Sequence, residues 1–289
     1  MKTLLLHTVT EHEVNQFVGS PAHLLILIGR NGAGKGSLAR QILSQVLKVD
    51  EDKLDSYQFF RQVSDENSSI TIDQVRQMQK FLSLKSTGTD GIRRGVIIEH
   101  SELLTIEAQN ALLKILEEPP LDTLIVMTVE SPNSLLATIY SRSQIIQIKQ
   151  PAESMISNYF KSIGVSDKKI DENYRISGGQ PGLLYSLLLE DNNESVTTAI
   201  TEVKRLLTAK KSERLVSVND MSSDKLRTKN LIYALERIAF ASLEQAAQSG
   251  NDEKVRSWSN ILENTIKANN DIRLNGNAKL ILTNLFLNI

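Results

Sequence analysis

The amino-acid sequence predicts an α/β domain with a parallel sheet, followed by a second half that is almost entirely helical. Three observations support this prediction. Short aliphatic runs alternate with segments of helical period up to about residue 150, a glycine-rich turn joins the first run to a helix, and the remaining chain keeps a helical period. Strands that alternate with helices of this length form parallel sheets covered on both faces.

Four buried strands are expected in the first half, because these runs of aliphatic residues are too short for helices. They lie at residues 23–28, 96–98, 124–129 and 144–148. Helices are expected at residues 37–49 and 72–84, and a flexible turn over residues 86–91. A third helix is expected to begin after Thr105, a good N-cap residue, and to stop at the proline pair that starts at Pro119.

The change of pattern divides the chain into three expected parts: an α/β domain at residues 1–150, a small helical domain at 151–193, and a longer helical domain at 194–289. The helices expected in the last two parts lie at residues 153–163, 182–189, 195–207, 224–247 and 252–269. The last part is suited to oligomerisation, although the same helical period would also serve an intramolecular bundle.

Composition excludes several classes of function. The chain has 289 residues, of which 40% are hydrophobic and 23% charged, the balance of a globular protein. It has no cysteine, so disulfides, thiolate zinc sites and cysteine nucleophiles are excluded. The formal net charge of −1 argues against a protein that grips nucleic acid alone through phosphates. Without a membrane-length apolar run or a secretory signal, the protein is expected to be cytoplasmic.

A glycine-rich turn with a lysine follows the first expected strand and opens the next helix. In the segment GRNGAGK, Gly29, Gly32 and Gly34 precede Lys35. Such glycines let backbone amides converge on phosphate oxygens, the helix N-terminus adds positive potential, and the lysine reaches the outer phosphates. The alternative is a turn without a ligand, but the strand, the spacing and the helix together favour descent from a nucleotide-binding loop.

This loop departs from its pattern at the metal-binding position. A Ser or Thr directly after the lysine would coordinate Mg²⁺ with its hydroxyl. Here that position is Gly36, and Ser37 follows one residue later. Since one residue rotates a helical side chain by about 100°, Ser37 is a poor substitute.

The second buried strand departs from its pattern as well. It should end in Asp-Glu, to hold Mg²⁺ and to polarise the attacking water, but Glu99 and His100 stand there instead. A histidine could act as a base near neutral pH, yet the metal-binding hydroxyl is missing too. The sequence therefore argues against ATP hydrolysis, and the phosphate loop with Glu99 and His100 is interpreted as a degenerate site.

Two further segments carry a resemblance to a known family. The segment AQNALLKILEEPP at residues 108–120, and TIYSRSQ at residues 138–144, closely resemble the bacterial DNA polymerase III clamp-loader subunits of the AAA+ class. The segment IDQVR at residues 72–76 matches them too, and the C-terminal NDIRL and LFL segments look like the end of their collar domain. Within that family the delta-prime subunit fits better than the hydrolysing gamma/tau subunit.

The resemblance implies roles for particular residues. Arg142 would reach into the ATP site of a neighbouring subunit, where a permanently charged planar guanidinium stabilises charge on a γ-phosphate. The alternative is an arginine that caps the following strand or pairs with a carboxylate. Thr128 matches a polar sensor position, and no arginine follows Gly178 in the expected lid, unlike the gamma-type pattern. The four-cysteine zinc module of the family is absent, so no zinc is expected.

The expected protein is therefore an AAA+ domain with a degenerate site, a helical lid and a helical collar, acting as the delta-prime-like rigid member of a heteropentameric clamp loader. The resemblance implies gamma/tau and delta subunits as partners, the sliding clamp and primer-template DNA reached through the assembly, and no membrane. No cofactor is expected to be required, although ATP or ADP could bind without hydrolysis. The alternatives are an active gamma/tau-like ATPase that uses Glu99 and His100, and a non-replicative P-loop regulatory module.

Overall fold

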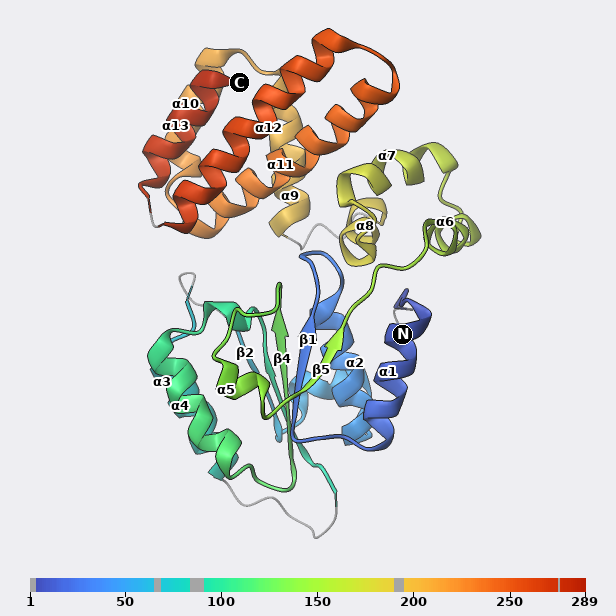
Figure 1. Ribbon diagram of the computed structural model, residues 1–289, viewed down its shortest axis with the longest axis vertical. Coiled ribbons are helices and arrows are strands. Elements are labelled where there is room, and N and C mark those ends of the chain that lie inside the picture. The colour runs from blue at the N-terminus through green and yellow to red at the C-terminus, as the bar shows by residue number, and fades with distance from the viewer. Residues whose placement is uncertain (1–3, 65–68, 84–90, 190–194, 275) are drawn as a thin grey trace. The chain divides into compact units, whose positions relative to one another are not determined.

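The computed structural model describes residues 4–64, 69–83, 91–189, 195–274 and 276–289 (Figure 1). The chain divides into two compact units, Met1–Ile156 and Ser157–Ile289. The first unit contains the expected α/β domain. The further division of the helical part at residue 193 stays a prediction.

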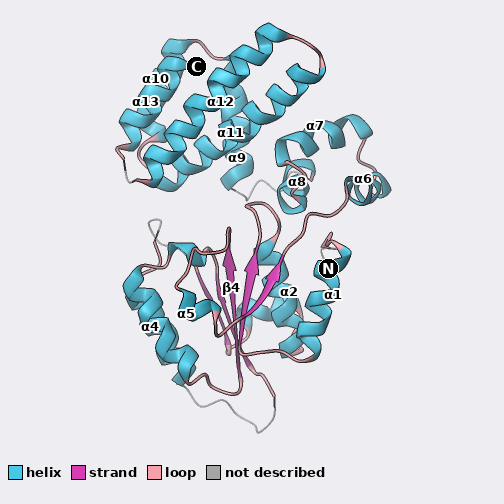
Figure 2. Ribbon diagram, viewed as in Figure 1, coloured by secondary structure: helices cyan, strands magenta, loops and turns pink. Residues whose placement is uncertain are grey.

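The first unit is built on a five-stranded parallel sheet with the strand order β2-β3-β4-β1-β5 (Figure 2). The strands are β1 (Leu24–Ile28), β2 (Phe60–Val63), β3 (Arg94–Ile98), β4 (Thr123–Val129) and β5 (Gln144–Gln147). The prediction of a parallel sheet is confirmed, and so are all four expected strands to within two residues at each end. Because β1 lies near the middle, the loop that follows it opens at the carboxyl edge of the sheet.

Both faces of the sheet are covered, as the alternation of side chains in β1 requires. Leu24 and Ile26 belong to one hydrophobic core, and Leu25 and Leu27 to the other. Figure 1 shows α3, α4 and α5 on one side of the sheet and α1 and α2 on the other. These helices are α1 (Thr8–Gly19), α2 (Lys35–Leu47), α3 (Ile72–Ser83), α4 (Ile106–Glu117) and α5 (Ala137–Tyr140), with short 3₁₀ turns η1 (Glu51–Ser56) and η2 (Ser101–Leu103).

The sequence pattern missed β2, α1 and α5. Strand β2 has the sequence FRQV, in which only Phe60 is fully buried, so it offers no aliphatic run to detect. Helix α5 is a single turn of four residues. The expected N-cap at Thr105 is present, since its side chain accepts a hydrogen bond of 3.2 Å from the Ala108 N–H. The turn expected over residues 86–91 falls, apart from Gly91, outside the described residues.

The second unit is entirely helical in its described residues, and the division between the units falls inside α6. Its helices are α6 (Glu153–Ser162), α7 (Asp167–Ser177), α8 (Pro181–Leu188), α9 (Ser195–Thr208), α10 (Lys211–Met221), α11 (Lys225–Gln248), α12 (Asp252–Arg273) and α13 (Ala278–Asn288). Helices α7 and α10 were not expected, because their sequences are mostly polar and each buries only two residues.

One hydrophobic core joins helices of the expected lid and collar. Leu183 of α8 packs in the same cluster as Ile200 of α9 and Leu231 of α11, with Leu282 of α13. Helix α11 also packs against α7. The α7–α8 pair is therefore attached to the long helices through shared apolar packing as well as through the chain.

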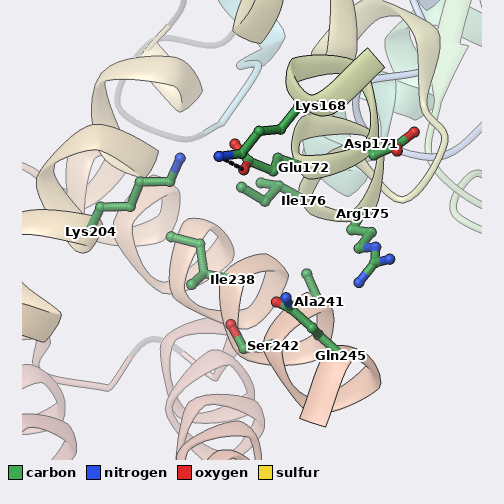
Figure 3. Close-up of a pocket in the computed structure, with 10 residues that line it drawn as sticks. All are labelled: Lys168, Asp171, Glu172, Arg175, Ile176, Lys204, Ile238, Ala241, Ser242 and Gln245. Carbon is green, nitrogen blue, oxygen red and sulfur yellow. Dashed lines mark ion pairs between the residues drawn. The ribbon is translucent and has the colours of Figure 1, made fainter. Parts of the chain in front are cut away.

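A groove of about 550 Å³ lies between α7, α9 and α11 of the second unit (Figure 3). Ile176, Ile238 and Ala241 supply its apolar surface, and Lys168 pairs with Glu172 at 4.0 Å along it. None of the site residues expected from the sequence lines this groove.

No helix among the described residues is both long and apolar enough to cross a membrane.

Candidate functional site

The turn between β1 and α2 has the geometry of a phosphate-binding loop. Gly29 follows β1, and its N–H donates to the Val129 carbonyl at 3.1 Å. Gly32 and Gly34 have φ angles of 81° and 84°, and Gly34 is the N-cap residue of α2. These left-handed conformations favour glycine, because a Cβ would clash with the backbone there. The glycine pattern read from the sequence thus matches the backbone that the loop adopts.

Lys35 is turned toward the loop itself. Its Nζ donates to the carbonyls of Gly29 at 2.8 Å and Arg30 at 3.1 Å, and the residue is buried. Burial lowers the pKa of Lys35 from its usual 10.5, while the nearby Glu102, Glu130 and Glu99 carboxylates act in the opposite direction. The ammonium group therefore donates to two carbonyls of its own loop, with carboxylates of its own chain near enough to act on its charge.

The position after Lys35 carries no metal-binding hydroxyl, and the neighbouring strand fills the space. A Cβ placed on Gly36 would collide with Oε1 of Glu99, whose Cδ lies 3.4 Å from that Cβ position. Ser37, one residue further along α2, is exposed. The residues present here do not fit a nucleotide-bound Mg²⁺ held by a hydroxyl at this helix position.

His100 directly follows Glu99 in a left-handed conformation, with a φ of 49°. Its N–H donates to Oγ1 of Thr128 in β4 at 3.1 Å, so the expected sensor residue supports the turn after β3. Its Nδ1 lies 3.5 Å from Oε1 of Glu102, and the hydrogen bond with Glu102 is the main cause that raises the pKa of His100 above its usual 6.5. The imidazole is thus engaged by a carboxylate of its own loop.

Arg142 lies two residues after the end of α5 and two before β5, with its side chain 37% exposed. One guanidinium nitrogen, Nη1, donates to the Thr138 carbonyl at 3.1 Å, and the other, Nη2, lies 3.8 Å from Oε1 of Glu117. The carboxylate pairing considered from the sequence is therefore present. It is an exposed and long ion pair, and such pairs contribute about 0–1 kcal/mol.

Gln109 is a buried polar residue of this region that the sequence analysis did not single out. Its Nε2 donates to the Leu104 carbonyl at 3.2 Å, and its Oε1 accepts from the Leu136 N–H at 2.8 Å. A glutamine among the apolar positions of the segment AQNALLK was the signal available. It lies on α4 and fixes the residue from which α5 begins.

The structure brings Lys35, Gly36 and Glu99 together at the carboxyl edge of the sheet, with His100 and Thr128 beside them. Arg142 is held separately, by Thr138 and Glu117. Among the residues that the structure describes, no group of three or more His, Asp or Glu side chains could hold a metal ion. The roles expected for these residues stay predictions.

The parallel sheet, its glycine-rich loop after β1 and the helical second unit define a P-loop fold of the AAA+ type. A Thermotoga maritima DNA polymerase III gamma subunit-related protein of known structure shares this fold, with a TM-score of 0.55 and 19% identity over 96% of this chain and 97% of that one. Residues 9–152 match the family described as DNA polymerase III, delta subunit. Over this segment, which is nearly half of the chain, the protein is similar to that family and is delta-prime-like.

Two relatives show where the likeness lies. The chain is 34% identical to DNA polymerase III subunit delta' of Haemophilus influenzae over 122 residues, which is 42% of this chain and 37% of that protein. It is 28% identical to subunit delta' of Pseudomonas aeruginosa over 204 residues, 64% of this chain and 62% of that protein. The match thus spans between about one third and two thirds of these relatives.

Proposed function

We propose that this protein is a non-hydrolysing, delta-prime-like subunit of a DNA polymerase III clamp loader and that it lends Arg142 to the ATP site of a neighbouring subunit. The relatives named delta' support the assembly, and the exposed guanidinium of Arg142 supports its role there. The proposed partners are gamma/tau and delta subunits, with the sliding clamp and primer-template DNA reached through the assembly. The chain needs no metal or nucleotide of its own for this role.

The contacts of Arg142 suit a residue that acts on another subunit. The Thr138 carbonyl orients the guanidinium from within the same turn, and the only carboxylate paired with it among the described residues is the exposed Glu117 at 3.8 Å. Breaking this weak, exposed pair costs little free energy. A γ-phosphate offers the guanidinium a charge-assisted and bidentate partner in its place. A guanidinium delivered in this way accelerates phosphoryl transfer by stabilising charge in the transition state.

The chain's own loop supports the non-hydrolysing part of the proposal. Lys35 is occupied by two loop carbonyls, Gly36 has no hydroxyl, and His100 stands where a carboxylate would polarise the attacking water. Each change removes a different component of Mg²⁺-dependent hydrolysis.

The test is ATP turnover by an assembly reconstituted with gamma/tau and delta subunits, in which only the ATP site that faces this chain is left intact. Arg142→Ala is expected to reduce turnover at that site by about 10³-fold or more, as for other arginines supplied in trans. Arg142→Lys is expected to recover little of it, because lysine lacks the planar fork. Unchanged turnover with Arg142→Ala would exclude the proposed role.

Two controls separate this role from a structural one. Glu117→Ala removes the ion pair of Arg142 and keeps the guanidinium, so turnover should stay near that of the unmodified assembly. If Glu117→Ala instead reproduces the loss, Arg142 acts through its own chain and the proposal is wrong. Lys53→Ala removes one exposed positive charge from η1 and should have no effect. The isolated chain should show no turnover; a turnover that Lys35→Ala abolishes would favour an active ATPase.

A further inference from the structure

The carboxylate of Glu99 occupies the space in which a side chain at position 36 would carry its hydroxyl. A Cβ on Gly36 would meet Oε1 of Glu99 at far below contact distance, and Glu99 is only partly exposed. The Glu99 N–H donates to the Val63 carbonyl at 2.9 Å, so the backbone that carries the carboxylate is held by β2. A glycine in α2 therefore makes room for a carboxylate from the turn that follows β3.

A nucleotide with its metal would require several of these contacts to break at once. Lys35 would have to leave the Gly29 and Arg30 carbonyls, and the Glu99 carboxylate would have to leave the side of Gly36. The phosphates would also approach three carboxylates that already face Lys35, namely Glu102, Glu130 and Glu99. These carboxylates would repel free phosphates and attract Mg²⁺ itself, so the obstacle to the magnesium complex is the set of contacts at Lys35 and Gly36.

We propose that Gly36 and Glu99 form a matched pair in which the carboxylate takes the place of the magnesium-binding side chain and keeps magnesium-bound nucleotide out of the loop. The departure at Gly36 in the phosphate loop and the departure at Glu99 after β3 are thus one feature. Reversing either departure alone leaves the site incomplete: a serine at position 36 still faces Glu99, and removal of Glu99 still leaves no hydroxyl. Only the double change supplies both the ligand and the space.

The test is equilibrium binding of a fluorescent ATP analogue to the purified full chain, with Mg²⁺ and with EDTA. The unmodified chain should bind no more tightly with Mg²⁺ than with EDTA. Gly36→Ser with Glu99→Ala should bind about tenfold more tightly with Mg²⁺ than with EDTA. This gain in binding free energy should exceed the sum of the gains of the two single variants. Because the atom that a serine displaces is the end of a flexible side chain, all three variants should fold, which thermal unfolding checks.

Glu130→Ala combined with Gly36→Ser is the matched control. Glu130 also faces Lys35, but it does not lie against Gly36. If this control gains as much magnesium-dependent affinity as the Glu99 double variant, the gain comes from the loss of any nearby negative charge. The proposal of a matched pair is then wrong. Tight magnesium-dependent binding by the unmodified chain would overturn the inference as well. Both measurements use the isolated chain, so their failure is distinguishable from failure of the trans role of Arg142, which is read in the assembly.

Discussion

The side-chain oxygen of Gln109 accepts a hydrogen bond of 2.8 Å from the backbone N–H of Leu136. Leu136 is the N-cap residue of α5, the single helical turn that leads to Arg142. The amide nitrogen of Gln109 is also used, since it donates to the Leu104 carbonyl at 3.2 Å, so both ends of the side-chain amide are held. Gln109 therefore positions the start of the helix that precedes the proposed trans arginine.

Gln109→Leu keeps the volume of the side chain and leaves the Leu136 N–H without its partner. The expected loss of unfolding free energy is about 1–3 kcal/mol, the cost of an unsatisfied buried donor, and chemical denaturation measures it. In the reconstituted assembly this variant should lose part of the turnover that Arg142→Ala loses.

Gln79→Leu is the matched control for Gln109. Gln79 also bonds to α4, since its Nε2 donates to the Ala111 carbonyl at 3.0 Å, but this bond does not involve α5. The substitution should affect stability without affecting turnover in the assembly. Equal losses of turnover from the two variants would show that general loosening of α4, and not the link to Leu136, is responsible.

The pairing of His100 with Glu102 makes a contribution to stability that depends on pH. The pKa of His100 is raised from 6.5, chiefly by its hydrogen bond with Glu102. A group whose pKa is raised on folding binds protons more tightly in the folded state. Its contribution to the free energy of unfolding is therefore fully present at pH values below the unfolded pKa. The contribution is then lost as pH rises through the higher folded pKa. His100→Gln should therefore lower the melting temperature more at pH 5.5 than at pH 8.5.

Glu102→Gln provides the control for this prediction. With the carboxylate neutralised, burial and Lys35 lower the pKa of His100, so the larger loss of melting temperature at pH 5.5 should disappear. The size of the effect is modest, because the His100 side chain is 45% exposed and its Nδ1 lies 3.5 Å from the Glu102 oxygen. A melting-temperature difference that grows toward pH 8.5 would contradict the assignment.

The buried ion pair of Arg94 and Asp122 is expected to matter more for stability than the exposed pairs. Nη2 of Arg94 lies 2.7 Å from Oδ1 of Asp122, and the two side chains are 7% and 19% exposed. Asp122→Ala removes the carboxylate that pairs with this buried guanidinium, and breaking a buried pair in this way costs about 3–5 kcal/mol. Asp73→Ala breaks the exposed pair with Arg76 and should cost about 0–1 kcal/mol. Urea unfolding of both variants checks the difference, and equal losses would contradict it.

The sequence predicted those elements that have a local sequence signal. Strand β1 is a pure aliphatic run that ends at a glycine, and α4 has both a good N-cap in Thr105 and a proline stop. Strand β2 could not be predicted, since three of its four side chains are not fully buried and its pairing with β3 is a long-range contact. The candidate site shows the same limit. The sequence shows Gly36 and Glu99 each as a departure from a pattern. That a side chain at position 36 would overlap the Glu99 carboxylate follows only from the position of β3 beside α2.

In the turn between α7 and α8, Gly178 lies against the side chain of Arg237. Gly178 caps α7 with a φ of 60°, and a Cβ on it would collide with the guanidinium of Arg237 from α11. Nε of Arg237 donates to the Ile176 carbonyl at 2.9 Å, so this guanidinium cannot move away without losing that bond. Arg237 therefore holds the C-terminal end of α7 against α11, and a glycine at 178 is what lets it approach.

Gly178→Ala is expected to destabilise the protein by more than the left-handed backbone alone explains. Gly164 supplies the comparison, because its φ is 89° and a Cβ there would meet nothing within 4 Å. Gly164→Ala should cost only the strain of the left-handed conformation, about 1–2 kcal/mol. Gly178→Ala should cost that plus the displaced hydrogen bond, about 0.5–1.5 kcal/mol more. In the Arg237→Ala background, where the guanidinium is gone, the two glycine substitutions should cost the same. If Gly178→Ala remains the more costly of the two in that background, its role lies in the turn itself and the contact with Arg237 is incidental.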